Sequence, residues 1–286
     1  MVKTFFNRII CGFFLGLSTF APGFSGSVVA ISMGVYHDLV KIASNPVTEI
    51  RRQIRFLIPL GIGALISLVL FVRVFGILFE QYERATLLLF VGLIAGNLPV
   101  IGRQLKGHGL QKRDIGGGAV SFAIAVGLGI LAIGTGHITG STEGVHFLGA
   151  AMGGFLAGAV AFIPGMSISA ILIVTGVFGP ILVMMESVVM LQTTYLPHVL
   201  VLVLSVVLGL VLTARGIKRV FDRVPIFANA CVFGFMSGTL IGIFIESVYI
   251  YDPYFSWWLG AVMLLLGVGL SLLFILLGKR MSPGAE

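Results

Sequence analysis

The chain has 286 residues, of which 58% are hydrophobic and 10% charged, and its mean hydropathy is +1.11. A soluble domain carries about 25% charged residues, so this composition excludes a soluble globular protein. It also excludes intrinsic disorder, which needs low hydrophobicity. The net charge of +7 is weak support for nucleic-acid binding, because the basic residues lie between long apolar segments.

The first half of the chain begins with an interrupted apolar region. Two short stretches, 9–20 and 28–40, flank the segment Ala21-Pro22-Gly23-Phe24-Ser25-Gly26-Ser27. Pro-Gly breaks a helix, and the serines that follow can cap the next one. We therefore expect a re-entrant hairpin of two half-helices over residues 9–40. Three apolar stretches of about the 20 residues that cross a bilayer follow at 56–75, 85–101 and 115–134.

The second half has the same organisation. Residues 147–162 and 170–185 flank Ile163-Pro164-Gly165-Met166-Ser167-Ile168-Ser169, which predicts a second re-entrant hairpin over 147–185. Three more spans are expected at 198–214, 226–245 and 256–277. The predicted fold class is therefore an all-α integral membrane protein.

An offset of 142 residues superposes the two halves without a gap. The first turn and an arginine match most distinctively: Pro22, Gly23, Ser25, Ser27 and Arg73 fall on Pro164, Gly165, Ser167, Ser169 and Arg215. We therefore expect a repeat over 1–134 and a second repeat over 147–286.

Positive charge sets the expected orientation. If both pairs of half-helices are re-entrant and the N-terminus is cytoplasmic, only Arg73 and Arg84 of the 18 basic residues lie outside. If the first pair crossed the membrane, Lys41 and the arginines at 51, 52 and 55 would also move outside. Three spans per repeat is an odd number, so the repeats have inverted topology and both termini are cytoplasmic. Inverted repeats with broken helices are typical of secondary transporters.

The two turns are expected to form one anion site. Helices that begin near Ser27 and Ser169 would direct unpaired N–H groups at a shared space, which suits an anion such as phosphate. Hydroxyls would add donors, and glycines would let a ligand approach the backbone. The candidate phosphate-binding residues of the turns are Gly23, Ser25, Gly26, Ser27, Gly165, Ser167 and Ser169. The alternative is that these residues only kink and cap packed helices.

Arg73 and Arg215 are the remaining candidates for phosphate binding, because an arginine can form a forked pair with phosphate. The alternative is an interfacial anchor that extends its charge to water. Glu80 and Glu83 are close enough in sequence to pair with Arg73.

Little in the sequence indicates an enzyme. It has no nucleophile elbow, zinc-site spacing or P-loop, so we expect no catalytic residues, no metal and no cofactor. Cys11 and Cys231 lie in separate apolar runs and do not indicate a disulfide framework. Glu186 and Glu246 lie close to span ends, where we expect solvated carboxylates rather than proton carriers.

The chain resembles the undecaprenyl-phosphate translocases of the PopT type over nearly its whole length. Two residues depart from the family pattern. In the first turn the family usually has Ser-Gly-Gly, and this chain has Ser27 in place of the second glycine. In the second turn the family usually has Ser-Gly-Ser, and this chain has Ile168 in place of the glycine. The segments that carry the resemblance are the two turns, Met33-Gly34-Val35-Tyr36, Pro59-Leu60-Gly61-Ile62-Gly63, Phe90-Val91-Gly92-Leu93-Ile94-Ala95-Gly96-Asn97-Leu98-Pro99 and Thr175-Gly176-Val177-Phe178.

The resemblance implies a flippase in the bacterial inner membrane. It would return undecaprenyl phosphate from the outer to the cytoplasmic leaflet for cell-envelope synthesis. Two other functions stay open: a transporter of another small anion, which would have a closed aqueous cavity instead of a groove open to lipid, and a membrane scaffold without transport. Proton coupling, sodium coupling and passive exchange are equally compatible with the sequence, as is any oligomeric state.

Overall fold

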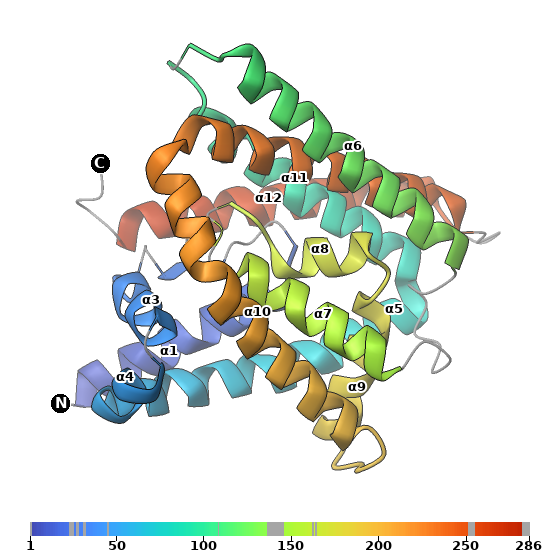
Figure 1. Cartoon of the computed structure of the whole chain (residues 1–286). Coiled ribbons are helices and arrows are strands. Elements are labelled where there is room, and N and C mark those ends of the chain that lie inside the picture. The colour runs from blue at the N-terminus through green and yellow to red at the C-terminus, as the bar shows by residue number, and fades with distance from the viewer. Residues whose placement is uncertain are drawn as a thin grey trace.

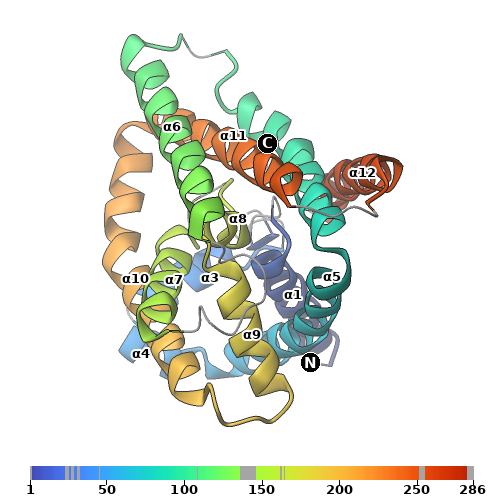
Figure 2. The same cartoon turned by 90° about the vertical axis from the view of Figure 1, so that its right-hand side faces the viewer.

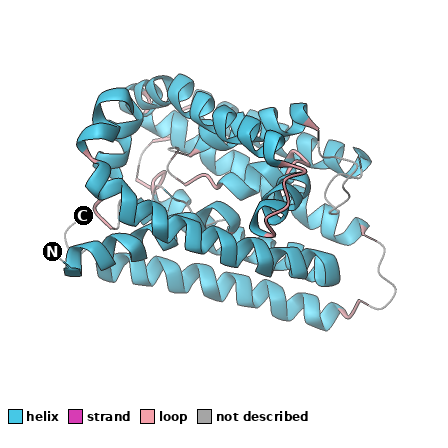
Figure 3. Cartoon of the chain, turned by 90° about the horizontal axis from the view of Figure 1, so that it is seen from below, coloured by secondary structure: helices cyan, strands magenta, loops and turns pink. Residues whose placement is uncertain are grey.

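The computed structural model describes residues 2–22, 26, 29–30, 33–44, 46–107, 109–135, 146–161, 163, 165–250 and 255–281. All regular elements in this part are helices (Figure 3), which confirms the all-α prediction. In chain order (Figure 1) they are α1 (Val2–Phe20), α3 (Tyr36–Ser44), α4 (Pro46–Arg52), α5 (Ile54–Arg103), α6 (Lys112–Thr135), α7 (Phe147–Val160), α8 (Ile168–Val174), α9 (Phe178–Val189), α10 (Leu196–Arg223), α11 (Pro225–Tyr249) and α12 (Trp257–Met281).

Five of the described helices, α5, α6, α10, α11 and α12, are long and apolar enough to cross a membrane. Helices α8 and α9 would make a sixth span if they are counted together, although they are bent by 119°. Large apolar side chains cover much of the surface, and Leu131, Leu148 and Leu265 are 66%, 70% and 68% exposed. An apolar surface of this extent suits hydrocarbon rather than water. The protein is therefore a multi-pass membrane protein.

Helix α5 contains two predicted spans, 56–75 and 85–101, within 50 residues. A straight helix of that length would measure about 75 Å, more than twice the hydrocarbon thickness of about 30 Å. The backbone leaves helical geometry at Tyr82 (φ −139°, ψ 43°), and the ribbon changes direction (Figure 1). The Thr86 hydroxyl donates to the carbonyls of Leu78 and Tyr82 at 3.1 and 2.8 Å. It thereby satisfies acceptors at the bend, so one continuous element supplies both spans.

The predicted half-helix over 170–185 is instead two helices. Helix α8 ends at Val174 and α9 begins at Phe178. Gly176 between them has φ +73°, a left-handed conformation that ends helices and that other residues rarely adopt. The other predicted half-helix of the second half, 147–162, corresponds to α7, which ends two residues earlier, at Val160.

Several helix pairs come into backbone contact through glycine, among them α1 with α5 and α7 with α10. A Cβ atom on Gly12 of α1 would overlap the carbonyl oxygen of Leu60 in α5. A Cβ atom on Gly154 of α7 would likewise overlap the carbonyl oxygen of Leu202 in α10. Small residues allow such close approach between membrane helices, and these two pairs are among the most extensive in the described chain.

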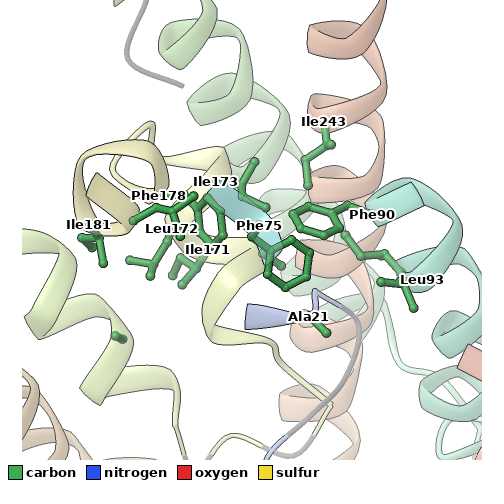
Figure 4. Close-up of a cluster of buried hydrophobic side chains, with 14 of the residues drawn as sticks. Ala21, Phe75, Phe90, Leu93, Ile171, Leu172, Ile173, Phe178, Ile181 and Ile243 are labelled. Carbon is green, nitrogen blue, oxygen red and sulfur yellow. The ribbon is translucent and has the colours of Figure 1, made fainter. Parts of the chain in front are cut away.

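The other large packing contacts join the two halves of the chain. Helix α12 packs on α5, and α6 packs on α11 (Figure 2). The main core lies where α5 meets α8 and α9. Phe90 contacts Phe75 and Phe178 with ring centroids 5.3 and 6.2 Å away, and Figure 4 shows these rings beside the side chains of α8.

Helices α3 and α4 are joined by a polar cluster around Glu49. The side-chain amide of Gln53 donates to the Glu49 carboxylate at 3.0 Å, and Lys41 pairs with the same oxygen at 3.6 Å. The Gln53 hydrogen bond, followed by the positive charges of Lys41 and Arg52, lowers the pKa of Glu49. The cluster therefore favours the ionised carboxylate.

Candidate functional site

The second turn leaves the end of α7 and reaches α8 through a left-handed glycine. Gly165 has φ +85°, and a Cβ atom there would lie 3.1 Å from Cγ1 of Ile101 and 3.4 Å from Cγ1 of Val232. The position therefore needs glycine for its backbone conformation and for space. Ile168 replaces a family glycine but begins α8, so it has no need of a left-handed conformation.

Ser167 and Ser169 form a buried hydroxyl pair. Their side chains are 2% and 0% exposed, and their Oγ atoms are 3.0 Å apart. Ser167 is the residue before α8, yet its side chain makes no capping bond to the helix. The one hydrogen bond between them uses one of their two hydroxyl hydrogens, and no further polar partner of the pair lies among the described residues. This geometry disfavours the simple capping alternative for the second turn.

Helix α8 is seven residues long. It packs among α1, α6, α7, α9 and α11, so it lies at the centre of the described fold (Figure 1). A helix this short has few aligned peptide dipoles. The hydroxyl pair is therefore the main polar feature of the turn, and the dipole of α8 contributes less than that of a longer helix would.

Most of the first turn lies outside the described residues, including Gly23, Ser25 and Ser27. Gly26 is described, and a Cβ atom on it would lie 2.8 Å from Oγ of Ser18 in α1. Ala21, which precedes the turn, is buried in the same core cluster as the side chains of α8 (Figure 4). The chain thus enters the first turn beside α8.

Arg73 and Arg215 are both exposed and are not part of the hydroxyl site. Each lies 19 residues after the first residue of its helix, α5 or α10, which is about 28 Å along the axis. That distance is close to the thickness of the hydrocarbon core, as an interfacial anchor requires. Within the described chain Arg73 has no ion pair, so the expected pairing with Glu80 or Glu83 is absent.

The expectation of a solvated carboxylate at Glu246 is wrong. Glu246 is 6% exposed on α11 and within electrostatic range of Glu83. Glu83 has one buried oxygen without a partner among the described residues. Glu186 is half-buried, with its carboxylate against Gly76 of α5. Position near a span end did not predict this burial, because the end of α11 that carries Glu246 lies close to Glu83, beside the bend of α5 at Tyr82.

The neighbouring Arg84 is also buried, with 9% exposure. Its guanidinium carbon lies 4.4 Å from the ring centroids of both Phe255 and Trp257. Cation–π contacts of this kind favour a desolvated arginine. Arg84 lies two residues after the bend of α5 at Tyr82, and it therefore connects α5 to the beginning of α12.

A cavity of about 510 Å³ lies beside the second turn. Ile163 and Met166 of the turn line it together with Ser121 of α6, and α10 and α11 form the remaining walls. The volume is within the range of ligand pockets, about 300–1,000 Å³. The walls are almost entirely apolar, so this cavity is not a closed aqueous site for a small anion.

Comparison with known proteins identifies the family. A sequence model described as VCA0040-like, undecaprenyl phosphate translocase-like, matches residues 15–252. The chain belongs to this undecaprenyl phosphate translocase-like family. It is also 26% identical over 248 residues to the polyprenyl-phosphate transporter of Staphylococcus aureus (strain NCTC 8325 / PS 47), covering 83% of this chain and 85% of that protein. No solved structure matches the chain.

Three features of this family member were not predicted from its sequence: the cavity, and the burial of Arg84 and of Glu246. A signal for the cavity was present in α10, where Thr213, Gly216, Ile217 and Val220 recur at helical spacing. The predicted span 198–214 ends before Gly216, so most of this face lay outside the expected membrane segment. Glycine and threonine within an apolar face are what distinguish a pocket wall from a uniformly lipid-facing span.

Proposed function

We propose that the protein transports polyprenyl phosphate, carrying it from the outer to the cytoplasmic leaflet without chemical change. The observation that carries this proposal is the buried hydroxyl pair of Ser167 and Ser169 in a member of this translocase-like family. Polar groups at membrane depth are costly and are usually functional. The second hydroxyl hydrogen of the pair would donate to a phosphate oxygen, and the left-handed Gly165 would let the phosphate approach the backbone.

The first turn would complete the phosphate site. Gly23, Ser25, Gly26 and Ser27 would face the phosphate opposite the second turn. The support is the sequence match of the two turns, and the burial of Ala21 beside α8. Phosphate would then receive hydroxyl and backbone donors from both halves of the chain.

We infer two inverted repeats, 1–134 and 147–286, each with one re-entrant hairpin and three spans. Several features recur at the offset of 142 residues: α5 begins at Ile54 and α10 at Leu196. Tyr82 and Val224 interrupt helices with similar angles, φ −139° and −138°. The close approach of Gly12 to Leu60 recurs as that of Gly154 to Leu202. These matches support a common unit with an odd number of spans.

In this arrangement both termini are cytoplasmic. The protein would lie in the inner membrane of a bacterium, and the transported carrier lipid would re-enter cell-envelope synthesis. Arg73 would lie at the outer face and Arg215 at the cytoplasmic face, where each would attract the lipid phosphate without entering the central site. Their exposure and their position along the helices support this role at the two interfaces.

Transport of labelled polyprenyl phosphate in proteoliposomes tests the proposal. The double variant Ser167→Ala with Ser169→Ala removes both hydroxyls, and we expect at least a tenfold lower rate, because a hydrogen bond to a charged group contributes about 1.5–3 kcal/mol. Ser237→Ala is the matched control, since among the described residues Ser237 bonds only to the Phe233 carbonyl of its own helix, at 2.8 Å. Unchanged transport by the double variant would exclude the hydroxyl site.

Two further arms separate the alternative functions. Inorganic phosphate uptake by the same vesicles would indicate a small-anion transporter. Absence of transport by the wild-type protein, together with no thermal stabilisation by polyprenyl phosphate relative to polyprenol, would indicate a scaffold.

A further inference from the structure

The cavity beside the second turn combines apolar walls with a basic rim. On α10, Thr213, Gly216, Ile217 and Val220 line it, at the i, i+3, i+4, i+7 positions of one helix face. The Thr213 hydroxyl is already bonded to the Gly209 carbonyl at 2.7 Å, so it adds little polarity to the cavity. Gly216 and Val220 are exposed, so the cavity reaches the molecular surface along α10.

Arginines flank the same end of the cavity. Arg223 lies one turn beyond Val220 on α10, and it is exposed. From α6, the Arg113 guanidinium carbon lies 5.5 Å from the ring centroid of Phe227, which lines the cavity. Nε of Arg113 pairs with Asp114 at 3.9 Å, which leaves its terminal nitrogens available. Asp222, next to Arg223, is exposed on the opposite side of α10 from the lining residue Thr213, because nine residues turn a helix by about two and a half turns.

Arg215 is placed differently. It precedes Gly216, and successive helical residues are turned by about 100° from one another. Relative to the face formed by Thr213, Ile217 and Val220, it lies on the far side of α10. Arg215 therefore does not belong to the rim.

We propose that this cavity binds the isoprenoid segment next to the head group of polyprenyl phosphate, with the phosphate at Arg113 and Arg223, as the station from which the lipid leaves the protein. This inference rests on the proposed function for its ligand. An apolar cavity that opens sideways beside two guanidinium groups fits an amphipathic lipid anion, because apolar walls exclude a free anion and guanidinium groups favour phosphate. A volume of about 510 Å³ takes only part of a long chain, and the rest stays in the bilayer.

The position of the cavity supports its place after the central site. Ile163 and Met166 line it and flank the turn that holds Gly165. Val232 contributes to both regions, since it lines the cavity and would contact a Cβ atom on Gly165 at 3.4 Å. The basic rim at the ends of α6 and α10 is the cytoplasmic end under the positive-inside rule.

Cys231 provides a direct test, because it lines the cavity and is partly exposed. Cys11 is the other cysteine and is buried at 3% exposure, so Cys11→Ala leaves one thiol. In nanodiscs, the rate at which N-ethylmaleimide modifies Cys231 is measured by mass spectrometry with polyprenyl phosphate, polyprenol or phosphatidylglycerol added. We expect polyprenyl phosphate to slow modification at least tenfold at saturation, and the other two lipids to require at least tenfold higher concentrations.

Gly216→Phe fills the cavity at a position where an added Cβ meets nothing within 4 Å. The matched control is Gly127→Phe, because Gly127 is also exposed, helical and open within 4 Å, but lies on α6 away from the cavity lining. Gly216→Phe should abolish the protection and slow transport at least tenfold, whereas the control should do neither. Arg113→Gln with Arg223→Gln should weaken protection by polyprenyl phosphate about tenfold or more and leave protection by polyprenol unchanged.

Equal protection by phosphatidylglycerol or polyprenol would overturn the proposal, as would normal transport by Gly216→Phe. These results differ from failure of the proposed function. If the wild-type protein transports polyprenyl phosphate but Cys231 is unprotected, the cavity proposal fails alone. If Cys231 is protected but the wild-type protein does not transport the lipid, the cavity site stands and the transport function fails.

Discussion

Replacing Gly165 by alanine should destabilise the protein through two separable effects. The left-handed φ of +85° costs a residue with a Cβ atom roughly 1–2 kcal/mol. The added atom would also lie 3.1 Å from Cγ1 of Ile101, closer than an ordinary contact, and overpacking costs typically 1–3 kcal/mol. The sum is about 2–5 kcal/mol, which corresponds to a fall of at least about 4 °C in the thermal midpoint.

Thermal unfolding in detergent measures the change, and a double-mutant cycle separates its parts. In an Ile101→Ala background the crowding disappears and the conformational cost stays, so Gly165→Ala should cost about 1–2 kcal/mol. Gly127→Ala, at an open helical position, should leave the midpoint unchanged or raise it. The reasoning is refuted if Gly165→Ala leaves the midpoint unchanged, or if its cost is the same in both backgrounds.

Three further changes test the charged residues. Glu246→Gln should raise the thermal midpoint, because a carboxyl group with 6% exposure must either be desolvated as an anion or take up a proton on folding, and both are costly. The same change at the exposed Glu80 should leave the midpoint unchanged, and a lower midpoint for Glu246→Gln would contradict this. Arg84→Lys should lower the midpoint by removing stacking on two aromatic rings, and an unchanged midpoint would show that the stacking contributes nothing. The pKa of Glu49 is lowered by the Gln53 hydrogen bond, so its stabilisation is present above the unfolded pKa of about 4.3 and is lost as pH falls through the folded value. Glu49→Gln should therefore weaken the acid-side decline of the midpoint between pH 7 and 3, and an identical pH profile would argue against this cluster.

The sequence predicted where helices break better than how they break. Pro164 with Gly165 marked the second turn, because those residues cannot continue a helix. The break at Gly176 was missed, since a glycine in an apolar run can equally well stay helical. At Tyr82 the expected loop between two spans is one non-helical residue, because the hydroxyl of Thr86 supplies hydrogen bonds across the bend.

For the candidate site, the sequence identified Ser167 and Ser169 but not their mutual hydrogen bond. Rotamers and burial depend on neighbours distant in the chain, such as Ile101 and Val232 beside the turn. The exposure of Arg215 agrees with the interfacial alternative. The helical spacing on α10 marks one wall of the cavity, but the cavity itself could not be predicted, because its other walls come from α6, α11 and the second turn.

The packing of α12 on α5 determines when α5 can complete its contacts during synthesis. Gly92 of α5 lies against the Leu264 carbonyl of α12, and Gly267 lies against the Leu89 carbonyl. The second part of α5 leaves the ribosome more than 150 residues before these partners do. Its glycine face must therefore wait in lipid or against the insertion machinery until α12 has been synthesised. A chain that ends before α12 would keep that face uncovered, so the synthesis of α12 is the step that completes the packing of α5.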